Sequence, residues 1–119
     1  MDVTPQVERI VRDSEIRSGT CLVFVPHTTA GVIINENADP AVKVDLLEIL
    51  GALVPRSRKY RHGEGNSDAH AKASLVGSSV SVVVRDGCLL LGTWQGVTFC
   101  EFDGPRRRRV VVQVQGEGG

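Results

Sequence analysis

At 119 residues the chain fits one domain, 1–119, in which about two-thirds of the unfolded surface can be buried, enough for a single core. Hydrophobic residues make up 41% and charged residues 24%, which is ordinary for a soluble globular protein and argues against long disorder. The formal net charge is zero, so no global field directs the chain toward nucleic acid or an anionic membrane, and any anion site must be local.

The patterns of apolar residues and cysteines favour a cytoplasmic protein. No apolar run approaches the roughly 18 residues that cross a bilayer, and the first five residues lack the basic and apolar regions of a signal peptide. Cys21, Cys88 and Cys100 are odd in number, lack Cys-x-x-Cys spacing and lie among apolar neighbours, which predicts buried, reduced thiols.

Helix signals appear three times. Thr4-Pro5 predicts a helix start, with a capping hydroxyl and a proline at the first position, and Gly19 ends that segment. Asp39-Pro40 is the strongest start, and the apolar stripe that follows at helical spacing ends at Pro55. A third, short helix begins at Asn66 or Ser67 and runs to about Leu75. The apolar stripe of the second helix consists of Val42, Leu46, Ile49, Leu50 and Leu53.

Strand signals dominate the remainder of the chain. Alternating valines follow Ser78, and Asp86-Gly87 predicts a two-residue hairpin turn. Gly116 to Gly119 reads as a frayed tail. The predicted strands cover 20–25, 32–34, 78–84, 88–91, 97–102 and 110–114. Two or three short helices with adjacent antiparallel strands predict an α+β domain built mainly on an antiparallel sheet or sandwich.

The three histidines, His27, His62 and His70, all fall in polar, glycine-containing loops beside strong structural elements. Neutral imidazole suits zinc, copper, nickel or iron. Three histidines with one open position are a known arrangement for a zinc ion that activates water or polarises a substrate oxygen. The spacing His-x7-His is not diagnostic, so loop histidines that make local hydrogen bonds remain the alternative.

Other polar residues surround these histidines in the sequence. Glu64 and Asp68 are candidates to orient imidazoles or to act as a general base, and solvated loop carboxylates are the alternative. A set of hydroxyl, amide and ammonium donors suits a phosphate at a helix N-terminus, although caps and turns use the same residue types. These donors are Thr28, Thr29, Asn66, Ser67 and Lys72.

The run Arg106 to Arg109 is the one conspicuous charge cluster. Its side chains alternate in an extended chain and no aromatic residues are interleaved, which favours a solvated strand entry over a nucleic-acid patch. Arg106, beside the Gly104-Pro105 turn, is the member expected to reach a substrate anion. Trp94 is either a core plug or a pocket wall.

Five segments together resemble the YjbQ family, in order and over nearly the whole chain. They are Val25-Pro26-His27-Thr28-Thr29-Ala30-Gly31, Ile34-Asn35-Glu36-Asn37-Ala38-Asp39-Pro40, His62 to Leu75, Leu91-Gly92-Thr93-Trp94-Gln95-Gly96 and Phe99-Cys100-Glu101-Phe102-Asp103-Gly104-Pro105-Arg106.

The resemblance implies a compact α+β protein with a mainly antiparallel, β-sandwich-like core, assembled as a homotrimer with polar sites near subunit interfaces. Family members usually carry another strand before the segment that corresponds to Asp2-Val3-Thr4. By motif position, the metal or catalytic histidines are His27, His62 and His70, with a divalent ion, zinc first, as the expected cofactor. The polar neighbours implied as catalytic are Asn35, Glu36, Asn66, Asp68 and Gln95.

The resemblance also implies a thiamin phosphate synthase activity, regarded as secondary in the family, which joins hydroxymethylpyrimidine diphosphate and thiazole phosphate and releases pyrophosphate. We therefore expect a metal-assisted transferase that acts on small phosphorylated substrates, with no nucleic-acid or membrane partner. The alternatives are a metal-dependent phosphohydrolase and a non-catalytic oligomer that binds a metal or small ligand.

Overall fold

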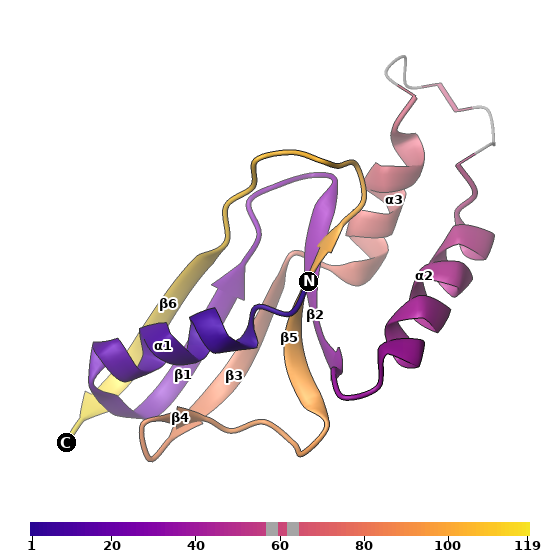
Figure 1. Ribbon diagram of the computed structural model, residues 1–119. Helices are drawn as coiled ribbons and strands as arrows, with labels where there is room; N and C mark the ends of the chain where they lie inside the picture. The colour runs from indigo at the N-terminus through magenta and orange to yellow at the C-terminus, as the bar shows by residue number, and fades with distance from the viewer. Residues whose placement is uncertain (57–59, 62–64) are drawn as a thin grey trace.

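The computed structural model describes residues 1–56, 60–61 and 65–119, and contains three helices and six strands within them (Figure 1). The helices are α1 (Thr4–Ser14), α2 (Pro40–Leu53) and α3 (Ser67–Val76). The strands are β1 (Ile16–Phe24), β2 (Ala30–Glu36), β3 (Ser79–Arg85), β4 (Cys88–Leu89), β5 (Gln95–Glu101) and β6 (Val111–Gly118). The predicted α+β class with short helices and antiparallel strands is confirmed.

The strands form two antiparallel sheets. One has the order β4-β3-β1-β6 and the other pairs β2 with β5. β1 begins at Ile16, before the predicted start, because Gly19 does not break the chain but pairs with Gly116 of β6. The expected frayed tail is wrong for the same reason, since β6 continues to Gly118 against the start of β1.

Helix α1 is anchored at its first residue. The Asp2 carboxylate accepts hydrogen bonds from the Thr4 backbone N–H at 2.9 Å and from the Thr4 hydroxyl at 2.6 Å. The same hydroxyl oxygen accepts the Val97 backbone N–H at 2.8 Å. Thr4 therefore joins α1 to β5, and Asp2, rather than Thr4, supplies the capping oxygen that the sequence analysis expected.

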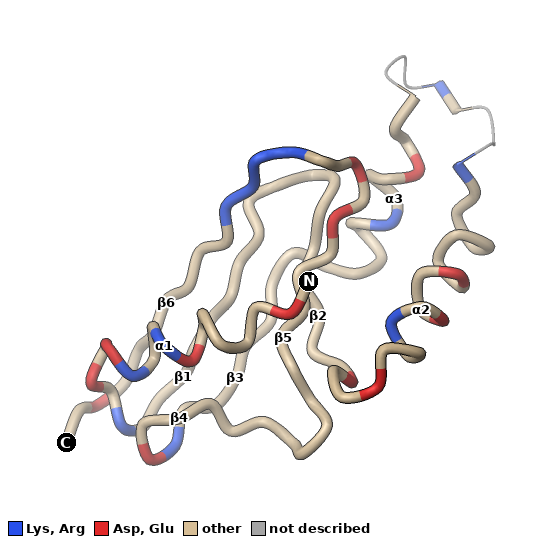
Figure 2. Tube along the Cα trace, in the orientation of Figure 1, with Lys and Arg blue, Asp and Glu red and all other residues tan. Residues whose placement is uncertain are grey.

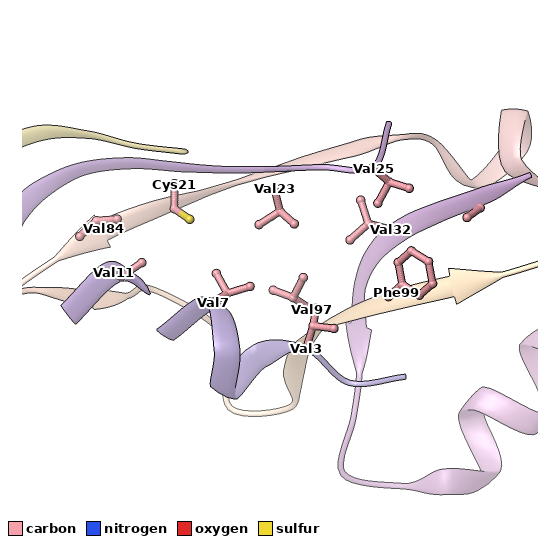
Figure 3. Packing of buried hydrophobic residues seen from close by; sticks show 11 residues of the cluster. Val3, Val7, Val11, Cys21, Val23, Val25, Val32, Val84, Val97 and Phe99 are labelled. Carbon is pink, nitrogen blue, oxygen red and sulfur yellow. The ribbon is translucent and has the colours of Figure 1, made fainter. Parts of the chain in front are cut away.

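The core lies between the four-stranded sheet and a layer made by α1, β2 and β5 (Figure 3). Val7 and Val11 of α1 are each 1% exposed, and they lie four residues apart on one helical face. They face Val23 of β1, Val84 of β3 and Val97 of β5 within one cluster. Small β-branched side chains fill most of this space, so the core is thin.

Helix α2 is confirmed within a residue of its expected start, with the Asp39 carboxylate accepting the Ala41 N–H at 2.9 Å. Its apolar stripe, however, buries no residue within this chain. Figure 1 shows α2 standing beside the two-stranded sheet, away from the four-stranded one. A groove of about 920 Å³ lies between them, lined by Leu46, Leu50, Ile34 and Phe99 among others.

Three smaller expectations are settled by exposure and backbone angles. The predicted turn is present, with φ of 53° at Asp86 and 76° at Gly87. Trp94 is 63% exposed and is not a core plug. All three cysteines are free, but Cys88 is exposed, because β4 lies at the edge of its sheet. No helix of the described residues is long and apolar enough to cross a membrane.

Candidate functional site

A polar pocket of about 370 Å³ forms where three segments distant in sequence meet. The first is the loop between β1 and β2, the second is the start of α3, and the third is the connection between β5 and β6. Its lining residues are Pro26, His27, Thr28, Thr29, Asn66, His70, Asp103, Arg106 and Arg108.

Backbone hydrogen bonds bring α3 to the loop. The turn that follows α3 accepts hydrogen bonds from both sides of the loop, since Val25 N–H donates to the Ser78 carbonyl at 2.8 Å and Val32 N–H donates to the Gly77 carbonyl at 3.1 Å. A Cβ on Gly31 would lie 2.6 Å from the Gly77 carbonyl oxygen. Only glycine permits this approach, which fixes α3 against β2 and so places His70 near His27.

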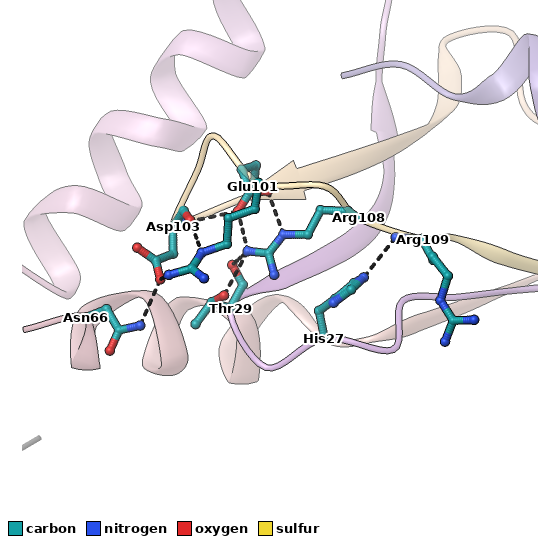
Figure 4. Close-up of polar contacts among 8 residues, drawn as sticks. His27, Thr29, Asn66, Glu101, Asp103, Arg108 and Arg109 are labelled. Carbon is teal, nitrogen blue, oxygen red and sulfur yellow. Dashed lines mark hydrogen bonds and ion pairs between the residues drawn. The ribbon is translucent and has the colours of Figure 1, made fainter. Parts of the chain in front are cut away.

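Asn66 links α3 to the β5–β6 connection (Figure 4). Its Nδ2 donates to Asp103 Oδ2 at 2.8 Å, and Arg106 Nη2 donates to the same oxygen at 2.9 Å. Arg106 Nε also donates to the Asp103 carbonyl at 2.8 Å. The hydrogen bond from Asn66, with a further contribution from Arg106, lowers the pKa of the Asp103 carboxyl below its usual value. Asp103 therefore stays ionised in the pocket wall.

Arg108 links the same connection to the β1–β2 loop. Its Nε donates to Glu101 Oε1 at 2.7 Å, and its Nη2 donates to Glu101 Oε2 and, at 2.8 Å, to Thr29 Oγ1. The hydrogen bond from Arg108 is the main cause that lowers the pKa of the Glu101 carboxyl, against a smaller opposing effect of burial. Arg108 thus acts as a clamp across the floor of the pocket.

His27 has a defined hydrogen-bond role. Its Nε2 accepts the backbone N–H of Arg109 at 2.9 Å. A ring nitrogen that accepts is unprotonated, so in this arrangement the imidazole is neutral and its proton lies on Nδ1. His27 therefore presents a donor, not a second acceptor, at Nδ1.

The structure gathers a subset of the predicted site residues. His27, Thr28, Thr29, Asn66, His70 and Arg106 all line the pocket, although the loop residues and His70 are about 40 positions apart. His62 and Glu64 lie outside the described residues, so the predicted convergence of three histidines stays a prediction. Among the described residues, no group of three or more histidine, cysteine or acidic side chains is placed to hold a metal ion.

Other predicted residues lie elsewhere. Asn35 and Glu36 are at the opposite end of β2 from the pocket, about 16 Å and about 20 Å from Ala30 at roughly 3.3 Å per residue. Gln95 pairs with Glu36 there, and its side-chain oxygen accepts the Gly92 N–H at 2.8 Å. These three residues therefore do not share the pocket within one chain.

Two of the predicted side chains on α3, Asp68 and Lys72, pair with each other. Lys72 Nζ contacts Asp68 Oδ2 at 3.3 Å, and Asp68 is 5% exposed. This pair lies one turn apart on the helix and, like Ser67, does not line the pocket. Both charges are thus satisfied within α3.

Asp103 and Arg108 line the pocket and were missed by the sequence analysis, as was Glu101, which binds Arg108 from outside the pocket lining. Asp103 was read only as part of a turn. Arg108 had a usable signal, because in an extended segment it falls on the same side as Arg106, the arginine that was chosen. Glu101 had none, since its role depends on the return of Arg108 over the end of β5.

Comparison with known proteins places the chain in a family. The family model described as UPF0047 protein YjbQ-like matches residues 1–117. The UPF0047 protein YugU of Bacillus subtilis is 50% identical over 117 residues, covering 98% of this chain and 89% of the relative. The UPF0047 protein MJ1081 of Methanocaldococcus jannaschii is also 50% identical, covering 98% of this chain and 85% of its own length.

Solved structures agree with this placement. A YjbQ/UPF0047 family protein of Clostridium acetobutylicum superposes with a TM-score of 0.95 at 51% identity, covering 97% of this chain and 89% of that one. A YbjQ-like protein of Sulfolobus solfataricus gives 0.95 at 38% identity, covering 98% and 86%.

These relatives correct the functional expectation. The Clostridium protein is described as uncharacterised and the Sulfolobus protein as of unknown function, and neither UPF0047 relative is described with an activity. The assignment as a thiamin phosphate synthase-like, metal-assisted transferase is therefore wrong, and nothing in these descriptions supports another enzyme class. What the sequence and the structures do show is that this chain belongs to the YjbQ-like UPF0047 family.

Proposed function

We propose that the pocket between His27, Asn66 and Arg106 binds a small anionic ligand. The observation that carries the proposal is the concentration of donors in one polar pocket: two guanidinium groups and two imidazoles from three separate segments. Figure 2 shows that these arginines belong to a basic stretch in the connection before β6. In a chain of zero net charge, this is a local positive surface.

The two arginines have different parts in this proposal. Arg108 is only 11% exposed and uses its side chain to join Glu101 and Thr29, so it positions the pocket. Arg106 is 53% exposed, and among the described residues its Nη1 has no hydrogen-bond partner. A guanidinium has five N–H donors, so Arg106 keeps several for an anion.

Calorimetric titration with inorganic phosphate tests this function. We expect Arg106→Ala to weaken binding by about tenfold or more, because a charge-assisted hydrogen bond contributes about 1.5–3 kcal/mol. Arg107→Ala is the matched control: Arg107 is the next residue, is exposed and does not line the pocket. Equal losses in both variants, or no phosphate binding by the wild type, would contradict an anion pocket.

A divalent ion, zinc first, is a second candidate ligand, favoured by the placement of His27 and His70 in one pocket. A zinc ion would supply Lewis-acid charge to an oxygen ligand. His27 can bind zinc only by giving up its present hydrogen bond. Its Nε2 already accepts the Arg109 N–H, and a metal on Nδ1 would place the ring proton on Nε2, where it would face that N–H. Zinc measured in purified wild type and in the His27→Ala and His70→Ala variants decides between the candidates.

We also propose that the chain forms a homo-oligomer, most specifically a homotrimer, through contacts made by α2. Val44, Leu47, Ile49 and Leu53 of α2 are 54–68% exposed, and the groove beneath the helix is apolar as well. A helix with this many exposed apolar residues is normally buried, and a second copy of the chain offers a matching apolar face. Light scattering coupled to size exclusion measures the mass, and a monomer at micromolar concentration would exclude this proposal.

A cytoplasmic location agrees with three free cysteines, one of them exposed.

A further inference from the structure

We infer that the pocket selects small oxyanions that carry a hydrogen-bond donor over oxyanions that carry none, and that Asp103 and Asn66 are the residues that discriminate. This inference rests on the anion pocket proposed above and adds its ligand class. Among the described residues, two acceptor atoms of pocket-lining residues, Asp103 Oδ1 and Asn66 Oδ1, have no protein donor, which is unexpected in a site that only attracts negative charge.

The first acceptor is the Asp103 carboxylate. Both donors that reach it, Asn66 Nδ2 and Arg106 Nη2, bind Oδ2. Among the described residues, Oδ1 has no hydrogen-bond partner, and the carboxyl group lines the pocket. An ionised carboxylate accepts and cannot donate, so a ligand atom beside it must carry a proton.

The second acceptor is Asn66 Oδ1. This atom is buried and has no hydrogen-bond partner among the described residues. Its orientation is fixed, because turning the amide would place Oδ1 against the acceptor oxygen of Asp103 in place of Nδ2. An unpaired buried acceptor costs about 1–3 kcal/mol, so a ligand or water that donates to this atom gains that free energy back.

The same pocket also contains donors, one of which, Arg106, lies directly beside Asp103. His27, with its proton on Nδ1, and the guanidinium of Arg106 belong to the lining together with Arg108. An oxyanion that still holds a proton can pair with both the donors and the acceptor. Its bare oxygens accept from the arginines, and its O–H donates to Asp103. A fully deprotonated oxyanion satisfies only the cations and lies against an ionised carboxylate.

Hydrogen phosphate and sulfate separate these cases. At about pH 8 both are tetrahedral dianions of similar size, and phosphate alone retains a proton. We expect the wild type to bind hydrogen phosphate at least about tenfold more tightly than sulfate in calorimetric titration, because sulfate has no proton to donate to the Asp103 carboxylate and its charge is repelled by that carboxylate. Arsenate, which keeps a proton, should follow phosphate, and molybdate, which does not, should follow sulfate.

Two variants assign the selectivity. Asp103→Asn keeps the shape, removes the charge and supplies an N–H, so sulfate binding should rise and the phosphate-to-sulfate ratio should fall to about twofold or less. Glu101→Gln is the charge control: it removes a carboxylate that does not line the pocket, and both anions should change together with the ratio kept. Thermal unfolding of each variant confirms that it is folded.

The outcomes are separable. Equal binding of phosphate and sulfate by the wild type overturns the selectivity and leaves the anion pocket standing. A ratio that survives Asp103→Asn overturns the role of Asp103. If neither anion binds, the proposed function itself fails, and the selectivity fails with it.

Discussion

Arg108 is held by more hydrogen bonds than any other side chain described around the pocket, and it joins Glu101 on one strand to Thr29 on a distant loop. Arg108→Ala removes these bonds and leaves Glu101 without its charged partner. We expect the free energy of unfolding to fall by about 1.5–3 kcal/mol, measured by urea denaturation. Arg107→Ala, one residue away and exposed, should change it by less than about 0.5 kcal/mol. Similar values for the two variants would contradict the clamp.

The Glu101 carboxyl makes the free energy of unfolding decrease as the pH is lowered. Its pKa in the folded chain lies below the ordinary value of 4.5, chiefly because of the hydrogen bond from Arg108. The folded state therefore binds fewer protons than the unfolded state, and the stabilisation is present above pH 4.5 and is lost as the pH falls through the lowered pKa. We expect Glu101→Gln to show a shallower loss of stability than wild type below that pH. Parallel acid limbs of the two curves would contradict the assignment.

The sequence identified residues of this pocket where the chemistry is visible in the residue type. His27, His70 and Arg106 were chosen for imidazole and guanidinium groups beside turns, and they do share a pocket. Asn35, Glu36 and Gln95 were chosen by motif, and they lie at the far end of β2 and β5. Membership of a family motif does not show whether a residue lies at the end of a strand that is near the pocket or at the end that is far from it.

At the scale of elements, Gly19 of β1 controls the pairing with β6. A Cβ on Gly19 would lie 1.9 Å from the Gln115 carbonyl oxygen, which belongs to backbone and cannot move aside. We expect Gly19→Ala to destabilise the protein by more than about 2 kcal/mol, as overpacking against backbone does. Gly51→Ala in α2 is the control, since nothing lies within 4 Å of its Cβ, and it should be neutral or stabilising by up to about 1 kcal/mol. Comparable thermal midpoints for the two variants would contradict this view.

Helix signals in this sequence located the starts of the three helices, but the end of the first helix was wrong, since α1 ends at Ser14 and not at Gly19, and strand boundaries were not located. Asp39-Pro40 and Asn66 placed α2 and α3 within one or two residues, because capping and proline effects are local. Gly19 was read as a stop, whereas it permits close approach of a strand almost 100 positions away. A glycine in such a pattern can either end a strand or allow close approach of a neighbouring strand, and only the position of that neighbour distinguishes the two roles.

At the scale of the whole molecule, α2 is the part that one chain leaves incomplete. None of its residues is buried within the chain, and the groove between α2 and the two-stranded sheet is lined by apolar residues of both. The apolar stripe correctly predicted a helix, but periodicity does not reveal whether the surface that buries the stripe belongs to the same chain. The association through α2 that we propose would couple folding stability to protein concentration.

We expect the thermal midpoint of the wild type to rise with protein concentration, because a partner that binds only the folded state stabilises it by mass action. Leu47→Glu combined with Leu53→Glu, at positions 62% and 68% exposed in the single chain, should abolish that dependence and reduce the mass to that of a monomer. Glu48→Gln on the same helix is the control and should retain both properties, since position 48 is already polar and exposed. A midpoint independent of concentration in the wild type would show that α2 remains uncovered in solution, and the apolar groove would then require a different partner.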